Sequence, residues 1–210
     1  MPIPAPIPVQ VQQRVRKSAT LRREEILDEA IRQIGRLGFR GFTVRELSAA
    51  CGMSNAGMLH YFPSKTELLI AVIDHLELRQ TARLQGYIDA CAAADRAGQT
   101  ALTEFRALLS AMMRQVLEDP ELARLVALVQ VEALDPDHPA HASFLRREAA
   151  ALAFLEDMLA SLVGDSVAVA RGLHAAMNGL ALQWLREGGT FDVMQAWEVI
   201  ASRLLSGAAQ

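Results

Sequence analysis

The side chains best suited to chemistry in this chain of 210 residues are concentrated in one short segment, residues 43 to 65. Arg45 can bind the edge of a guanine and Asn55 the edge of an adenine, each through two hydrogen bonds. Ala56 and Gly57 are small enough to let the backbone approach a base, and Ala56 can touch a thymine methyl group. Phosphate oxygens would be bound by nearby hydroxyl, imidazole and ammonium groups and by helix-initial N–H groups, at Thr43, Ser54, His60, Tyr61 and Lys65. This combination predicts contact with double-stranded DNA.

Two short helices must position these side chains. Thr43, followed three residues later by Glu46, predicts a capping box at the start of a helix that ends at the next glycine. Ser54 can cap a second helix over residues 55 to 61, because Pro63 forbids its continuation. Two helices joined by a short turn that contains glycine are typical of a helix-turn-helix.

Helical periodicity dominates the rest of the chain, and no run of alternating polarity is long enough to propose a sheet. We therefore expect an all-α fold. The helix before the helix-turn-helix should start at Thr20 and end where Gly38 supplies a left-handed cap. Its expected buried stripe is Leu27, Ala30, Ile31, Ile34 and Leu37, and the next helix should pack Val44, Leu47 and Ala50 inward.

The remaining helices are predicted from apolar stripes and from the glycines and prolines between them. They are expected near residues 65 to 93, 100 to 118, 121 to 133, 139 to 162, 166 to 187 and 191 to 206. Ser64 with Glu67 forms a second capping box at the start of the first of these. The predicted organisation is a proline-rich and basic arm at 1 to 17, a helix-turn-helix domain at 18 to 65 and a larger helical domain at 66 to 210.

Charge is divided unevenly along the chain, although the formal net charge is only −3. Residues 1 to 65 carry ten basic and five acidic side chains, a net charge of +5, and the remainder carries eleven and nineteen, a net charge of −8. A polyanion contact confined to the first part fits this division. Cys51 and Cys91 fit neither a disulfide framework nor a paired-thiol site, and no stretch is apolar enough to span a membrane, so a cytoplasmic protein is expected.

Residues 21 to 70 resemble the N-terminal domain of the TetR (AcrR) family of bacterial transcription regulators. The resemblance is strongest over residues 38 to 43, at the turn around Gly52, and from Tyr61 to Lys65. It implies a homodimer that binds a palindromic operator, acts as a repressor and is released by a small ligand. The family often has a tyrosine where this chain has Leu59, so one phosphate contact would be missing here.

The resemblance also implies a ligand pocket and a dimer interface in the larger domain. Candidate pocket residues are apolar with a few polar interruptions, as a mostly apolar ligand requires: Phe105, Met112, Met113, Gln130, Glu132, His174 and Asn178. The last two helices would form the interface through Leu173, Met177, Leu180, Trp184, Trp197, Ile200 and Leu204. For each of these residues, ordinary core packing is the alternative that the sequence leaves open.

Other kinds of function have weaker signals. The loop residues Asp135, Asp137, His138 and His141 lack a recognised metal-ligand pattern, and no catalytic triad or phosphate loop can be singled out, so neither cofactor, metal nor enzyme activity is predicted. Two alternatives are a lipid- or small-molecule-binding helical protein with vestigial DNA binding, and an enzyme that uses His174 and Glu132. Without DNA, Arg45 would be a solvated helix residue and Asn55 only a helix-initiating one.

Overall fold

Polar side chains begin the helices of the N-terminal part, as the sequence predicts. The computed structural model describes residues 18 to 95 and 101 to 207, and its first four helices are α1 (Ala19–Gly41), α2 (Val44–Ala50), α3 (Asn55–Tyr61) and α4 (Lys65–Asp95). The Thr43 hydroxyl accepts a hydrogen bond from the N–H of Glu46 at 3.2 Å, and the Ser54 hydroxyl accepts one from Gly57 at 3.1 Å. Each cap satisfies a donor that the first helical turn leaves unpaired.

The C-terminal part adds five helices, so the described residues form an all-α fold, as predicted. These are α5 (Ala101–Glu118), α6 (Pro120–Glu132), α7 (His141–Leu159), α8 (Ser166–Arg186) and α9 (Val193–Gly207). No helix in the described ranges is long and apolar enough to cross a membrane. The predicted arm at residues 1 to 17 and the predicted helix break around Gly98 lie outside the described residues.

The first helix departs from its predicted boundaries in a way that has a backbone cause. It starts after Ser18, whose hydroxyl caps Leu21, and not at Thr20. At Gly38 the backbone has a φ of 72°, as expected for a glycine that ends a helix, and the chain then continues through one more turn. After this kink Phe39 and Phe42 lie in the core, whereas Leu37, just before it, is 51% exposed and not buried as predicted. Ala50, also predicted to be buried, is exposed at the end of α2.

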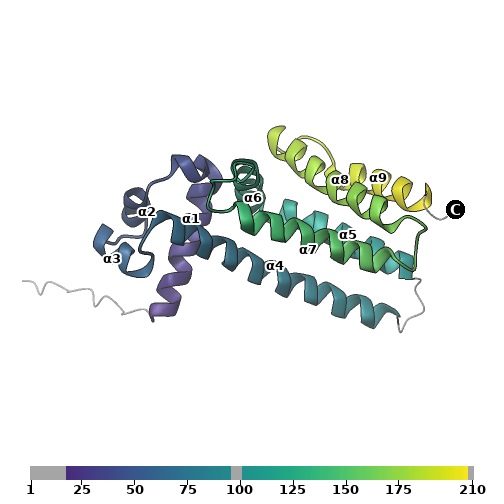
Figure 1. Cartoon of the computed structure of the whole chain (residues 1–210), viewed down its shortest axis with the longest axis horizontal. Coiled ribbons are helices and arrows are strands. Elements are labelled where there is room, and N and C mark those ends of the chain that lie inside the picture. Colours follow the sequence, from purple (N-terminus) through teal and green to yellow (C-terminus); the bar gives the residue numbers. More distant parts are fainter. Residues whose placement is uncertain (1–17, 96–100, 208–210) are drawn as a thin grey trace, which may run out of the picture.

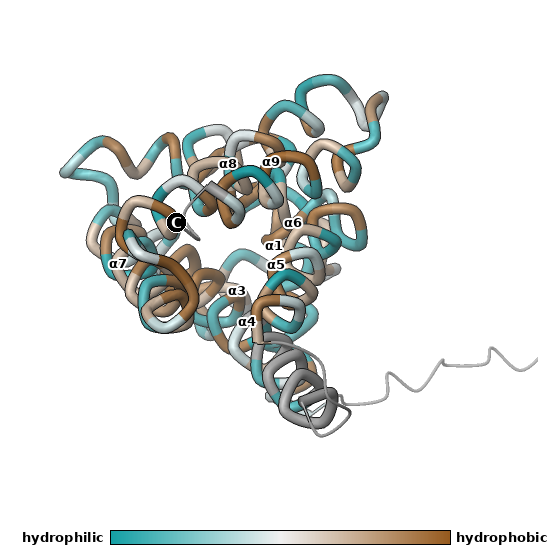
Figure 2. Tube along the Cα trace, turned by 90° about the vertical axis from the view of Figure 1, so that its right-hand side faces the viewer, coloured by the Kyte–Doolittle hydropathy of each residue, from teal (hydrophilic) through white to brown (hydrophobic). Residues whose placement is uncertain are grey.

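The structure has two apolar cores, and α6 belongs to the first of them. That core contains residues of α1, α2 and α3, of the first turns of α4, and Leu122, Leu125 and Val129 of α6. The second core lies among α5, α7, α8 and α9, around the buried Trp197. Figure 2 shows that the helices alternate between hydrophobic and hydrophilic residues, as amphipathic helices around shared interiors do. Residues 66 onward are therefore not packed independently of the helix-turn-helix.

The helices are arranged along one long axis (Figure 1). At one end lie α1, α2 and α3, and α4 runs from them along the length of the molecule. On the other side of α5 and α7, away from α4, lie α8 and α9. The most extensive contact between two helices joins α1 to α6, so the helix-turn-helix end is packed against the start of the C-terminal part.

Candidate nucleic-acid interface and pocket

The turn between α2 and α3 is fixed by hydrogen bonds on both sides. Gly52 has a φ of 62°, and the N–H of Met53 donates to the carbonyl of Ser48 at 2.9 Å. From α1, the Arg22 guanidinium donates to the carbonyl of Cys51 at 2.6 Å. Leu47 and Met58 are fully buried beneath the two helices. The two helices are thus held in one relative orientation, which a surface that reads DNA requires.

One face of α3 is exposed, and it carries three of the nine predicted DNA contacts, Asn55, Ala56 and His60. Asn55, Ala56, Leu59 and His60 lie on this face, and Arg45 is exposed on α2. Leu59, the departure from the family pattern, thus occupies the face where its tyrosine counterpart would be presented. Tyr61, in contrast, is half-buried and packs against the first core.

Gly57 is small for a reason internal to the protein. A Cβ atom at this position would lie 3.3 Å from the Ser54 hydroxyl, which caps the helix, and 3.6 Å from the end of the Met53 side chain. A larger residue would crowd the cap. The requirement for glycine therefore does not depend on a base in the groove.

Lys65 is held by the protein's own groups. Its ammonium group lies 4.7 Å from the ring centre of Phe39 and 4.8 Å from that of Phe42, and it donates to the carbonyl of Arg40 at 3.4 Å. Burial lowers the pKa of Lys65, while the Glu132 carboxylate acts in the opposite direction. These contacts offset the unfavourable position of a cation in the first turn of α4, for which the sequence alone suggests a phosphate.

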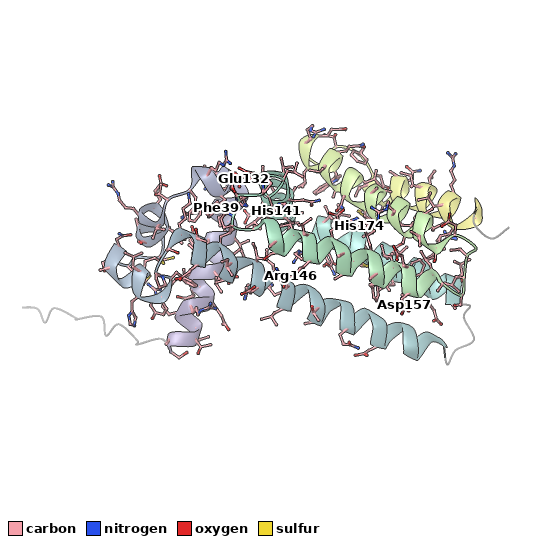
Figure 3. All side chains as sticks on the ribbon, viewed as in Figure 1. Phe39, Glu132, His141, Arg146, Asp157 and His174 are labelled. Carbon is pink, nitrogen blue, oxygen red and sulfur yellow. The ribbon has the colours of Figure 1, made fainter. Side chains whose placement is uncertain are left out.

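Glu132 connects α6 to the end of α1, 93 residues earlier in the chain. Its carboxylate accepts hydrogen bonds from the N–H of Phe39 at 3.0 Å and from the N–H of Arg40 at 3.4 Å. Beside it, the Arg40 guanidinium forms a salt bridge of 3.0 Å with Asp135. Figure 3 shows Glu132 and Phe39 together at this junction, and His174 well away from both. Glu132 therefore lies outside the pocket predicted for it, and does not form a site with His174.

The loop after α6 uses its polar residues to hold its own shape. The buried His138 accepts the N–H of Ala140 at Nδ1, at 3.2 Å, and packs edge-on against Phe39. Burial lowers the pKa of His138. The Asp135 carboxylate accepts the N–H of Asp137, and a ring nitrogen of His141 lies 2.7 Å from the carbonyl oxygen of Ala133. Within the described part of the chain no three metal-ligating side chains are gathered.

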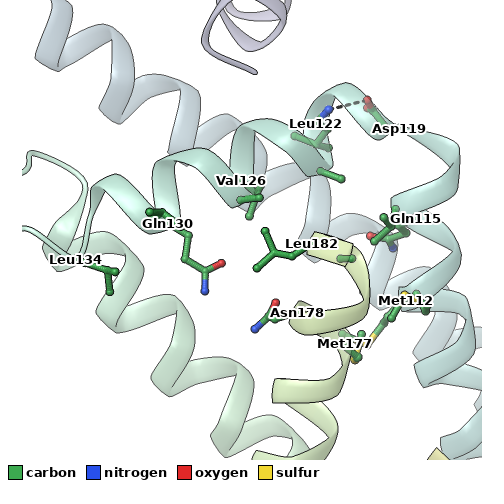
Figure 4. A pocket seen from close by; sticks show the side chains of 16 residues that line it. Met112, Gln115, Asp119, Leu122, Val126, Gln130, Leu134, Met177, Asn178 and Leu182 are labelled. Atoms are coloured by element: carbon green, nitrogen blue, oxygen red, sulfur yellow. Dashed lines mark hydrogen bonds between the residues drawn. The ribbon is translucent and has the colours of Figure 1, made fainter. Parts of the chain in front are cut away.

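A pocket of about 310 Å³ lies between α5, α6 and α8 (Figure 4). Four of the predicted residues line it, namely Met112, Met113, Gln130 and Asn178. Sequence reasoning missed most of the apolar lining, including Leu122, Val126, Leu134 and Leu182. Of the other predicted residues, Phe105 is buried in the second core, and His174 is half-buried on α8 outside the lining.

The predicted interface residues divide into two groups. Leu173, Leu180 and Trp197 are buried within the single chain, and the Trp197 indole N–H donates to the Ser110 hydroxyl at 3.3 Å. Met177 lines the pocket. The remaining three, Trp184, Ile200 and Leu204, are half-buried on α8 and α9. The buried residues Leu173, Leu180 and Trp197 cannot contact a partner chain directly and could only support the helices that do.

The fold and this site define a helix-turn-helix protein with a helical C-terminal domain and a pocket. Residues 26 to 72 match the family described as bacterial regulatory proteins, tetR family. Over 63 residues the chain is 43% identical to the HTH-type transcriptional regulator BetI of Brucella canis, a match that covers 30% of this chain and 31% of BetI. The chain thus matches about a third of the length of that curated relative.

Solved structures extend the likeness to the whole fold. A TetR transcription regulator from Haloarcula marismortui superposes with a TM-score of 0.70 at 18% identity, over 91% of this chain and 100% of that one. The regulator FadR from Bacillus subtilis, solved in complex with stearoyl-CoA, gives 0.67 at 16% identity, over 88% and 98%. The family match is thus confined to residues 26 to 72, and beyond them the likeness to these regulators is one of fold.

Proposed function

We propose that this protein is a dimeric repressor that binds a palindromic DNA operator and is released by a small, mostly apolar ligand. The observation that carries the proposal is the exposed face of α3 and α2, where Arg45, Asn55, Ala56 and His60 project from a rigidly capped helix-turn-helix. The start of such a helix fits the major groove, where Arg and Asn read base edges. Thr43, Ser54, Tyr61 and Lys65 would bind the flanking phosphates, and Gly57 would allow the backbone to approach.

A two-fold dimer would present two copies of α3 to two half-sites about one DNA turn apart. We assign its interface to the outer face of α8 and α9, where Trp184, Ile200 and Leu204 are half-buried and Val199 is 49% exposed. Isolated exposed apolar residues are common on protein surfaces. Their position on the helices that the family resemblance implicates supports this assignment.

Ligand release requires that the pocket and the DNA-binding helices influence each other. The proposed connection is α6, because Gln130 lines the pocket while Glu132, two residues later, bonds to the end of α1. A ligand that moves α6 would change the position of α1 and with it the separation of the two recognition helices. The effect requires that the ligand bind the two arrangements with different affinity.

A gel-shift assay of the full chain with DNA from upstream of its own gene tests the proposal. Arg45→Ala and Asn55→Ala should each weaken specific binding by about 1 to 3 kcal/mol and relax the sequence preference. Arg186→Ala, which removes an exposed arginine at the far end of α8, is the matched control and should have no effect. If the intact dimer shifts no DNA even at low salt, the alternative of a lipid- or small-molecule-binding protein is favoured.

A further inference from the structure

Two amide side chains face each other across the pocket. Gln130 on α6 and Asn178 on α8 point toward one another in Figure 4, while Met112 and Met177 lie at the other end of the space. Three apolar side chains that line the pocket, Val131, Leu134 and Leu182, are also exposed at the surface, and Leu134 is 76% exposed. The pocket therefore combines a long apolar wall with a pair of amides, and the other polar residues of its lining are Gln115 and Asp119.

The charges around the pocket disfavour an anion. Among the described residues that line it there is no lysine, arginine or histidine. Its one charged residue, Asp119, is acidic and accepts the N–H of Leu122 at 3.1 Å, which caps α6. Residues 66 to 210 carry eleven basic and nineteen acidic side chains, so the wider field is also negative. A carboxylate or phosphate bound here would lose water without gaining a cationic partner.

The orientation of Asn178 affects what the pair of amides can bind. Its amide nitrogen lies 3.4 Å from both ring nitrogens of His174, and a neutral imidazole offers one of them as an acceptor. Burial lowers the pKa of His174, which keeps its ring neutral near pH 7. One N–H of Asn178 is thereby directed at His174, which leaves its carbonyl oxygen and its second N–H available to a ligand. Gln130 can supply both a donor and an acceptor.

We propose that the ligand of this pocket is an uncharged amphiphile whose polar end both donates and accepts hydrogen bonds, as an amide does, attached to an alkyl chain. The polar end would lie between Gln130 and Asn178, and the alkyl chain would lie along the methionines and leucines. The pocket volume of about 310 Å³ is at the small end of ligand sites. This inference rests on the proposed function and specifies its effector by chemical class.

Calorimetric titration of the full chain with three matched probes near neutral pH tests this class without DNA. The probes are octanamide, octanoate and octylammonium, which share one alkyl chain and differ in the charge of the polar end. Octanamide should bind at least about tenfold more tightly than octanoate, because the anion would remain unpaired in the pocket. Equal or tighter binding of octanoate, tighter binding of octylammonium, or no binding of any probe overturns the proposal.

A variant that gains a new ligand preference can test where the polar end of the ligand binds, because a variant that merely damages the fold would lose binding of all probes. Gln130→Lys places a cation beside the proposed polar end and should reverse the preference in favour of octanoate. The matched control is Gln183→Lys, an exposed position on α8 outside the pocket, which should leave the preference for octanamide unchanged. An unchanged preference in Gln130→Lys would refute the assignment. If the protein shifts its operator but prefers octanoate, the ligand class fails while the proposed regulatory function stands.

Discussion

The carboxylate of Glu132, at the end of α6, accepts the backbone N–H of Phe39 at 3.0 Å, just after the kink at Gly38 in α1. The second oxygen accepts the N–H of Arg40 at 3.4 Å. A helix kink frees N–H groups from their usual partners, and here a carboxylate from another helix occupies them. This contact links the pocket helix α6 directly to the end of α1.

Replacing Glu132 should destabilise the protein even though a similar shape is kept. In Glu132→Gln the two backbone donors face a neutral amide, and we expect the free energy of unfolding to fall by about 1 to 2 kcal/mol. Glu118→Gln, an exposed glutamate at the end of α5, should change it by less than about 0.5 kcal/mol. Urea denaturation measures both. Equal stability of the two variants would show that the link is energetically unimportant.

Stability should decrease in mild acid because of His138. Burial lowers its pKa in the folded state below the ordinary value of 6.5, with Arg40 acting in the same direction and Glu132 and Asp135 in the opposite one. As the pH falls below about 6.5, the unfolded chain binds the proton first, so stability is full above that pH and is lost toward the lower folded-state pKa.

The pH profile of the unfolding free energy, measured by urea denaturation, tests the role of His138. In His138→Asn the new side chain can still accept the N–H of Ala140 but does not titrate. The unfolding free energy of this variant should therefore change less steeply with pH, with a slope smaller by at most about 1.4 kcal/mol per pH unit. His174, whose pKa burial also lowers, contributes with the same sign, so His174→Asn is the comparison variant. A His138→Asn profile as steep as that of the parent would contradict the prediction.

Lys65 should contribute to folding as well as to any phosphate contact. Lys65→Met keeps the apolar part of the side chain but removes the ammonium group from the rings of Phe39 and Phe42, and we expect a loss of about 0.5 to 1 kcal/mol in thermal or urea unfolding. Arg36→Met, at an exposed position of α1, should show no comparable loss. A purely DNA-binding role would leave the unfolding of Lys65→Met unchanged.

The assignment of the dimer interface can be tested with single charges. Val199→Glu places a carboxylate on the outer face of α9 and should shift the protein toward the monomer, because a buried unpaired charge is strongly unfavourable. Leu145→Glu, on the exposed surface of α7, should leave the mass unchanged. Light scattering coupled to gel filtration reads the mass of each. Dimerisation unaffected by Val199→Glu, or lost in Leu145→Glu, would place the interface elsewhere.

Features set by neighbouring residues could be predicted from the sequence. The caps at Thr43 and Ser54 and the positive φ at Gly38 depend on interactions within a few positions, and each occurs as expected. The observed limits of most helices lie within one or two residues of the predicted ones, because caps, glycines and prolines act locally. Leu37 has the helical spacing of a buried residue but is 51% exposed, because periodicity does not show whether a neighbouring element covers the last turn before Gly38.

Features set by contacts between distant helices were predicted only in part. Met112, Gln130 and Asn178 line one pocket, but nothing in the sequence indicates that α6 and α8 meet there, so Leu134 and Leu182 were missed. The partner of Glu132 lies 93 residues away and is a backbone group, which has no sequence signature. Trp197 shows the same limit, since a tryptophan at helical spacing fits a core and an interface equally well.

Helix α6 lies between the pocket and α1, and this position affects which substitutions can change the ligand that is bound. Substitutions on α5 or α8, such as at Met112 or Asn178, can alter which molecule is bound while leaving the packing of α1 intact. Substitutions on α6 fall on one helix that lines the pocket with Val126 and supports α1 with Leu125 and Val129. Over the history of such proteins, new ligand preferences would therefore arise more readily through α5 and α8, with α6 the slowest of the three pocket walls to change.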